Sequence, residues 1–246
     1  ATPPVETWDP RAGKRMHFVP AFGDWSLFQS SADGFEIRKR TQPGFTWLSA
    51  ARGQRAGCLG YVGTPQGGVA FGVRNFWQSH PGELAIHGAT GATAEATAWL
   101  WSPRAGAMDL RGYHGAAGME TYAQQLEGME ITYEDYEPGF DRPLGVARTS
   151  EMFLWVLPAT PSRERLAQLA EVVRTPPVLM TTPQRLQACG VFGGLWSPVD
   201  RSTPAKAALE DQLDWHFHFY ETQREQRRWY GFWDFGDVMH SYDADR

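Results

Sequence analysis

The sequence predicts a mainly β protein: a large antiparallel β-sandwich followed by a helical segment. Three observations predict this fold class. Short runs of aromatic and β-branched residues recur about every 10 to 20 residues up to residue 160, separated by turns. The 246 residues include 26 Gly, 17 Pro and 11 Trp, which suits many strands joined by tight turns. Helical periodicity appears only after residue 160.

The strands are predicted in order along the chain. Residues 25–31 and 35–41 flank Ala-Asp-Gly, which is typical of a β-hairpin. Further strands are expected within residues 44–53, 68–79, 93–103, 129–140 and 145–158. Alternation along 68–79 would place Arg74, Phe76, Gln78 and His80 on one face and Val73, Asn75, Trp77 and Ser79 on the other.

Two helices are predicted near the end of the chain. The first opens at Pro161 and stops before Pro176, and the second begins at Ser202-Thr203-Pro204 and runs for about 25 residues. The predicted inner face of the second helix comprises Leu209, Leu213, His216 or Phe217, and Tyr220. This gives a sandwich domain at 1–190, a linker at 191–203 and a helical start at 204–246. Since a single apolar stripe needs partners, we expect the chain to be a fragment that ends just inside a helical domain.

Charge and composition exclude several classes of function. A net charge of −5 leaves no basic footprint for general nucleic-acid binding, and no stretch of about 18 apolar residues could span a membrane. There is no GxSxG, P-loop or GxGxxG motif between a strand and a helix. Cys58 and Cys189 have no metal or redox spacing, which leaves open one disulfide or two buried thiols.

The last 18 residues, WYGFWDFGDVMHSYDADR, are the densest in chemistry-bearing side chains. Tyr230, His240 and Tyr242 are candidate catalytic acids or bases. Trp229, Phe232 and Trp233 are candidate sugar platforms, and Asp234 and Asp237 could orient a histidine or bind sugar hydroxyls. Taken one at a time, such aromatic residues after a helix are more often packing residues.

The same segment offers a candidate metal site. Asp234, Asp237 and His240 would share one face of a helix and could hold a divalent cation. The pattern is short, and Gly231 and Gly236 argue against a continuous helix, so the sequence predicts no metal and no other cofactor.

The β region also offers candidate residues. Arg74, Asn75, Gln78 and His114 are candidate substrate-binding residues, and the basic run Arg38-Lys39-Arg40 is predicted to be a solvated strand edge.

Several long strings carry a resemblance: LFQSSADGFEIRKRT, GGVAFGVRNFWQSHP, AWLWSPRAGAMDLRGYH, ETYAQQLEGMEITYEDYEPGF, GVARTSE and the closing motif. Together they resemble the rhamnogalacturonan exolyase-like family of polysaccharide lyases, over roughly residues 22–246. The resemblance implies an exported, secreted or periplasmic, multidomain enzyme. It also implies a central supersandwich of the galactose-mutarotase-like type, a C-terminal α/α toroid that is mostly missing from this chain, and an active site between the two.

The resemblance implies β-elimination on an acidic, uronate-containing glycan such as rhamnogalacturonan. That reaction needs a group that neutralises the C5 carboxylate, a base and an acid. Two alternatives stay open. The chain could be a non-catalytic sandwich that binds glycan or braces a toroid, or part of a glycoside hydrolase using paired carboxylates such as Asp234 and Asp237, or Asp237 and Asp243.

Overall fold

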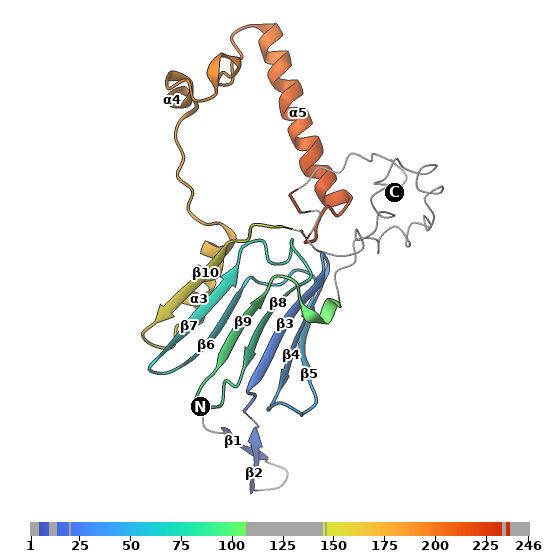
Figure 1. The fold of residues 1–246 in the computed structure, drawn as a ribbon, viewed down its shortest axis with the longest axis vertical. Coiled ribbons are helices and arrows are strands. Elements are labelled where there is room, and N and C mark those ends of the chain that lie inside the picture. The colour runs from blue at the N-terminus through green and yellow to red at the C-terminus, as the bar shows by residue number, and fades with distance from the viewer. Residues whose placement is uncertain are drawn as a thin grey trace, which may run out of the picture.

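The computed structural model describes residues 5–9, 14–19, 21–106, 145, 147–232 and 235–236, with the first two ranges as backbone alone. Two antiparallel sheets form the sandwich (Figure 1), and the strand β1 (Val5–Asp9) pairs separately with β2 (Lys14–Val19). The five-stranded sheet has the order β5-β4-β3-β8-β9, and the three-stranded sheet has the order β10-β7-β6. The predicted antiparallel sandwich is therefore confirmed.

The five-stranded sheet is built from β3 (Asp24–Ser31), β4 (Gly34–Arg40), β5 (Leu48–Gly53), β8 (Gly82–His87) and β9 (Glu95–Trp99). The hairpin predicted from Ala-Asp-Gly is present, with Leu27 opposite Ile37. Since β4 lies between β3 and β5, its basic run is not at a sheet edge, and that prediction was wrong. The run instead alternates across the sheet, which directs Arg38 and Arg40 to one face and Lys39 to the other.

The outer face of this sheet carries paired charges. The fully buried Asp24 accepts hydrogen bonds from Arg40 Nε at 2.6 Å and from the Gly88 amide at 3.0 Å. The buried Glu83 accepts hydrogen bonds from the hydroxyls of Ser26 and Ser102. These partners compensate the cost of taking carboxylates out of water.

The core lies between the two sheets. The three-stranded sheet consists of β6 (Leu59–Thr64), β7 (Gly67–Val73) and β10 (Met152–Leu157). Phe71 and Val73 from β7 cluster with Leu84 from β8, and Leu27 and Ile86 pack against them. Alternation along each strand brings these apolar side chains to the inner faces.

Helix α3 (Arg163–Arg174) covers the other side of the three-stranded sheet through the buried Leu169 and Val173. Ser162 caps the helix by accepting a hydrogen bond from the Arg165 amide, so the helix begins two residues after Pro161. Gly72 permits this close packing, because a Cβ atom there would lie 3.0 Å from Val173 Cγ2 and 2.6 Å from the Cys58 carbonyl oxygen.

The two cysteines are both free. Cys58 is buried and Cys189 is exposed, so neither the predicted disulfide nor the predicted pair of buried thiols is present.

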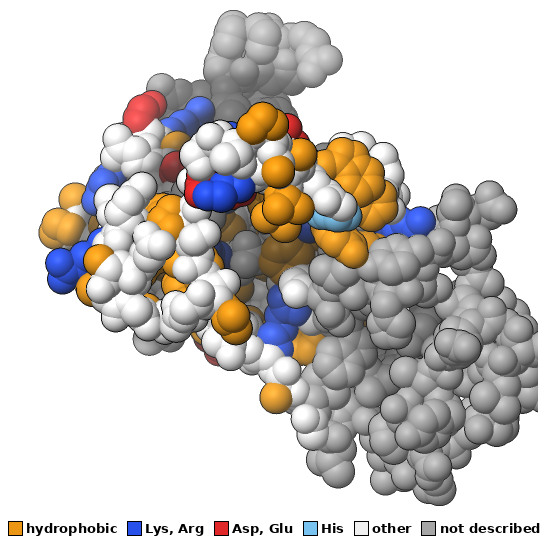
Figure 2. All heavy atoms as spheres, turned by 90° about the horizontal axis from the view of Figure 1, so that it is seen from above, with side chains coloured by type: hydrophobic (Ala, Val, Ile, Leu, Met, Phe, Trp, Pro, Cys, Tyr) orange, Lys and Arg blue, Asp and Glu red, His pale blue; other side chains and the backbone are white. Residues whose placement is uncertain are grey.

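The helical segment stands away from the sandwich (Figure 1). It contains α4 (Pro183–Ala188), which the sequence did not predict, and α5 (Pro204–Gln226), which begins within the predicted start Ser202-Thr203-Pro204 and is capped by Thr203. No residue of α5 is buried, and the side chains of its predicted inner face, such as Leu209, Leu213 and Phe217, are exposed. Figure 2, which looks down on this end of the molecule, shows hydrophobic side chains exposed beside Lys and Arg. Within the described residues, no helix is both long and apolar enough to cross a membrane.

Candidate functional site

The site is built on a loop at a position where the sequence pattern predicts the end of a strand. Strand β7 ends at Val73, and residues 74–80 form a turn that we call the rim loop. Asn75 adopts the left-handed conformation (φ +57°), which Asn tolerates better than most residues, and its carbonyl accepts a hydrogen bond from the Ser79 amide at 2.9 Å. The predicted two-face alternation over 74–80 was therefore wrong, because the backbone curls at the rim of the sandwich.

The segment after α5 docks on this loop. Residues 229–232, which we call the junction segment, lie along the rim loop through two backbone hydrogen bonds of 2.6 Å: the Gly231 amide donates to the Gln78 carbonyl and the Phe232 amide to the His80 carbonyl. Gly231 has φ +129°, and a Cβ atom there would lie 3.3 Å from His80 Cε1. Glycine thus suits both the backbone conformation and the close approach.

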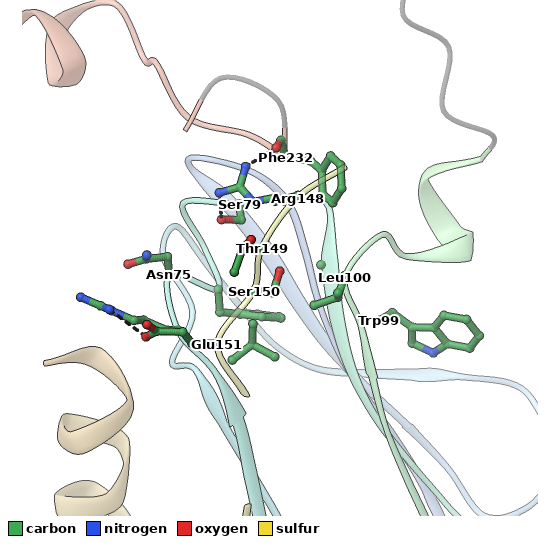
Figure 3. Close-up of a pocket in the computed structure, with 13 residues that line it drawn as sticks. Asn75, Ser79, Trp99, Leu100, Arg148, Thr149, Ser150, Glu151 and Phe232 are labelled. Atoms are coloured by element: carbon green, nitrogen blue, oxygen red, sulfur yellow. Dashed lines mark hydrogen bonds and ion pairs between the residues drawn. The ribbon is translucent and has the colours of Figure 1, made fainter. Parts of the chain in front are cut away.

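A pocket of about 170 Å³ opens where the rim loop, the start of β10 and the junction segment meet (Figure 3). Two arginines, three hydroxyl side chains, an amide and a carboxylate give it a polar lining with an aromatic wall at Phe232. The Trp99 ring points away from the other labelled side chains. The lining residues are Val73, Arg74, Asn75, Phe76, Ser79, Gly82, Trp99, Leu100, Arg148, Thr149, Ser150, Glu151 and Phe232.

Arg148 connects the two sides of the pocket. Its guanidinium donates to the Phe232 carbonyl, to Ser79 Oγ at 2.9 Å and to the Phe235 carbonyl at 3.4 Å. The guanidinium carbon lies 5.6 Å from the Phe232 ring centre and 5.9 Å from that of Phe235. Burial lowers the pKa of Arg148, although an arginine remains charged at any physiological pH.

Arg74 is the second cation of the pocket. Its Nη1 pairs with Glu151 at 2.7 Å, and its backbone amide donates to the Glu151 carbonyl at 3.0 Å. Its Nε is buried and has no hydrogen-bond partner among the described residues. An anionic ligand could satisfy such a donor if the side chain adjusted, whereas a neutral apolar ligand would leave it unpaired.

Tyr230, one of the predicted acids or bases, is buried beside the pocket and does not line it. Its hydroxyl donates to Glu225, whose other carboxylate oxygen pairs with Arg55 at 2.9 Å. The Tyr230 ring lies 4.7 Å from that of Trp77, over which the Arg55 guanidinium sits at 4.1 Å. Burial, together with the bond to Glu225, raises the pKa of Tyr230, which opposes formation of a tyrosinate base.

The other predicted site residues are divided between those the structure places and those it does not describe. Arg74 and Asn75 line the pocket. Gln78 contributes its backbone carbonyl to Gly231, while the buried Trp229 donates its amide to the Arg224 carbonyl at 3.1 Å. Outside the described residues lie His114, Trp233, Asp234, Asp237, His240 and Tyr242.

Four pocket residues that precede β10 were not among the predicted site residues: Arg148, Thr149, Ser150 and Glu151. The alternating pattern of residues 145–158 predicts a strand here, with Arg148, Thr149 and Glu151 as a buried polar pair, but residues 147–151 precede the strand and are not part of it. The available signal was a run of polar side chains directly before the apolar strand Met152–Leu157, a position that favours a loop at the strand end. Across the described residues, His, Cys, Asp and Glu form no cluster of three that could hold a metal ion.

The structure is a two-sheet sandwich followed by a helical segment whose end docks on the sandwich beside a polar pocket. The chain belongs to the PcRGLX-like, or rhamnogalacturonan exolyase-like, family. Residues 1–171 match the model of the PcRGLX-like protein central beta sandwich domain, and residues 176–246 match that of its C-terminal alpha/alpha toroid domain. The toroid was predicted to be mostly missing, but it is represented here from residue 176 onward. The division predicted at residues 191–203 stays a prediction.

The chain is also similar to a curated protein of Bacillus subtilis (strain 168), "Uncharacterized protein YetA". The two are 39% identical over 223 residues, which cover 91% of this chain and 25% of the relative. The chain therefore spans about a quarter of the length of that relative.

Proposed function

We propose that the complete protein is a polysaccharide lyase that cleaves a uronate-containing acidic glycan, such as rhamnogalacturonan, by β-elimination. The observation that carries the proposal is the polar pocket between the sandwich and the toroid-family segment, which holds Arg74 and Arg148. Two guanidinium groups in a protein of net charge −5 mark a local preference for an anionic group. Membership of a rhamnogalacturonan exolyase-like family supports the choice of a uronate.

The proposed reaction assigns three roles. A cation neutralises the C5 carboxylate, and Arg74 is the candidate because its Nε has no partner among the described residues. A base then takes the C5 proton, the C4–C5 double bond forms, the C4–O4 bond breaks and an acid protonates O4. His240 and Tyr242 remain the candidates for base and acid. Tyr230 is assigned to bracing the junction, because its pKa is raised and its hydroxyl is engaged by Glu225.

Sugar contacts are proposed for both sides of the pocket. Asn75 and the hydroxyl side chains at 149–150 can exchange hydrogen bonds with sugar hydroxyls, and Phe232 offers a ring edge or face to sugar C–H groups. Trp233, Asp234, Asp237 and His114 stay candidates for further contacts. Because polysaccharides of this kind lie outside the cell, we also propose that the protein is secreted or periplasmic.

The test is an ultraviolet assay of the full-length protein with rhamnogalacturonan and a panel of other polyuronates. The C4–C5 double bond conjugates with the carboxylate, so elimination raises the absorbance. Arg74→Met should raise KM for the acidic glycan, whereas the matched Arg201→Met should not, because Arg201 pairs with Asp211 and Asp214 on the helical segment. A flat trace on every glycan from folded protein would contradict the lyase proposal.

A bracing role is the second candidate, and the Arg148 contacts favour it. They hold the junction segment to the sandwich whether or not chemistry takes place there. In that case the protein would bind glycan without turnover, and substituting His240 or Tyr242 would leave binding unchanged. Hydrolysis by Asp234 and Asp237 would instead yield new reducing ends without the chromophore.

A further inference from the structure

We infer that Arg148 is a positioning residue that holds the junction segment in register on the rim loop and so sets the pocket wall for the substrate. The inference deepens the proposed function and rests on it for its kinetic part. The geometry that carries it is the set of acceptors around one partly buried guanidinium: two backbone carbonyls after α5 and one hydroxyl of the rim loop.

The three acceptors come from regions matched by different domain models. Ser79 lies within residues 1–171, matched by the sandwich model, whereas Phe232 and Phe235 lie within residues 176–246, matched by the toroid model. Arg148 itself precedes β10 and donates in both directions. Figure 3 shows its side chain extending from the strand end toward Ser79 and Phe232. One side chain therefore ties the two domains together at the pocket.

The chemistry of the contact requires arginine. A planar guanidinium presents five N–H groups in a fixed fork, so it can serve acceptors on separate sides at once. A lysine ammonium sits at a single point on a flexible stem, and it could not span a hydroxyl of the rim loop and two carbonyls of the opposite segment in this arrangement. The three acceptors at Phe232, Ser79 and Phe235 are all neutral, so in these bonds the cation holds backbone and a hydroxyl in place rather than pairing with a carboxylate.

The contact fixes the position of Phe232. The Phe232 ring lies 5.7 Å from the Trp101 ring in an edge-on arrangement, its amide is bonded to the His80 carbonyl and its own carbonyl accepts from Arg148. Without Arg148, the aromatic wall would lose this anchor and keep the two backbone bonds to the rim loop and the edge-on contact with Trp101. A shift of about 1 Å in a positioning group can cost about 100-fold in rate, so the loss should appear in kcat more than in KM.

The test compares Arg148→Lys with Arg201→Lys in the full-length protein. Both changes replace an arginine that makes several hydrogen bonds, but the partners of Arg201, Asp211 and Asp214, lie in α5, so only Arg148→Lys releases a contact between domains. We expect Arg148→Lys to lower kcat on the acidic glycan by about 10- to 100-fold with KM within about threefold, and Arg201→Lys to leave both unchanged. A normal kcat in Arg148→Lys would overturn the inference.

Hydrogen exchange provides a readout that does not depend on lyase activity. The Gly231 and Phe232 amides are bonded to the rim loop, so in Arg148→Lys they should exchange faster while amides of β7 and β8 keep their protection. Unchanged exchange at residues 231–232, or equal loss of protection in β7 and β8, would overturn the inference. A protein without any eliminating activity but with this local change in exchange would refute the proposed function and leave the domain contact standing.

Discussion

Replacing Tyr230 with Phe removes one hydroxyl at the point where α5 meets the sandwich. That hydroxyl donates to Glu225, and the ring stays in place against Trp77 at 4.7 Å and against Phe235 at 5.8 Å. The substitution keeps the volume of the ring, so the hydrogen bond is the interaction under test.

The magnitude follows from the type of bond and its surroundings. A hydrogen bond to a charged group contributes about 1.5 to 3 kcal/mol. Glu225 keeps 45% of its side chain exposed and retains its pair with Arg55, which points to the lower end, about 1.5 kcal/mol. The bonds from Tyr230 and Arg55 lower the pKa of Glu225, so its stabilising contribution is present above the unfolded-state pKa and is lost as the pH falls through the folded-state pKa.

The assay is a urea titration of wild type, Tyr230→Phe and Tyr61→Phe. Tyr61 provides the matched control, since its hydroxyl is buried without a hydrogen-bond partner among the described residues and its loss should be neutral or stabilising. Tyr230→Phe should lower the free energy of unfolding near neutral pH, with a smaller difference in acid, and should keep the pH profile of turnover. Unchanged stability together with lost turnover would refute the bracing role and indicate that Tyr230 acts as a catalytic acid or base.

Two further predictions concern the sandwich. Asp24→Asn should cost about 3 kcal/mol at neutral pH, because it leaves Arg40 without its buried carboxylate. Burial raises the pKa of Asp24, but the bonds from the Gly88 amide and Arg40 outweigh this effect, so the folded-state pKa lies below the usual value. In urea titrations the cost of Asp24→Asn should therefore shrink as the pH falls through that folded-state pKa, and a cost independent of pH would contradict this. Gly72→Ala should destabilise by about 1 to 3 kcal/mol, because the added Cβ would meet the Cys58 backbone carbonyl at 2.6 Å, whereas Gly57→Ala meets nothing within 4 Å and should be neutral; equal stabilities of the two variants would contradict the close packing at Gly72.

Much of the fold could be predicted from local signals. The hairpin between β3 and β4 follows from Ala-Asp-Gly between alternating segments. The start of α5 follows from Thr203 before Pro204, because the Thr203 hydroxyl accepts a hydrogen bond from the Lys206 amide. The position of β4 inside the sheet could not be predicted, because strand order depends on contacts between distant segments. From its sequence alone a basic run is expected to be solvent-exposed. Only the folded sheet brings a partner such as Asp24 beside Arg40.

The site was harder to predict than the fold. Alternation predicted a strand through residues 74–80, whereas Asn75 adopts the left-handed conformation and its carbonyl accepts a hydrogen bond from the Ser79 amide, so these residues form a loop. Arg148 carried no signal of its own, since its acceptors lie 69 to 87 residues away in the sequence. Within the closing motif, Tyr230 and Phe232 lie against the rim loop, and the Tyr230 ring packs with Trp77; the catalytic and binding roles predicted for the motif stay predictions.

The central claim is that the complete protein breaks a uronate glycan by elimination, without water. The most direct measurement is mass spectrometry of the products formed from rhamnogalacturonan by the full-length protein in water labelled with heavy oxygen. Elimination predicts an unsaturated product that is one water lighter than the hydrolysis product and carries no heavy oxygen. Saturated products that carry the label would contradict the account and assign the reaction to hydrolysis.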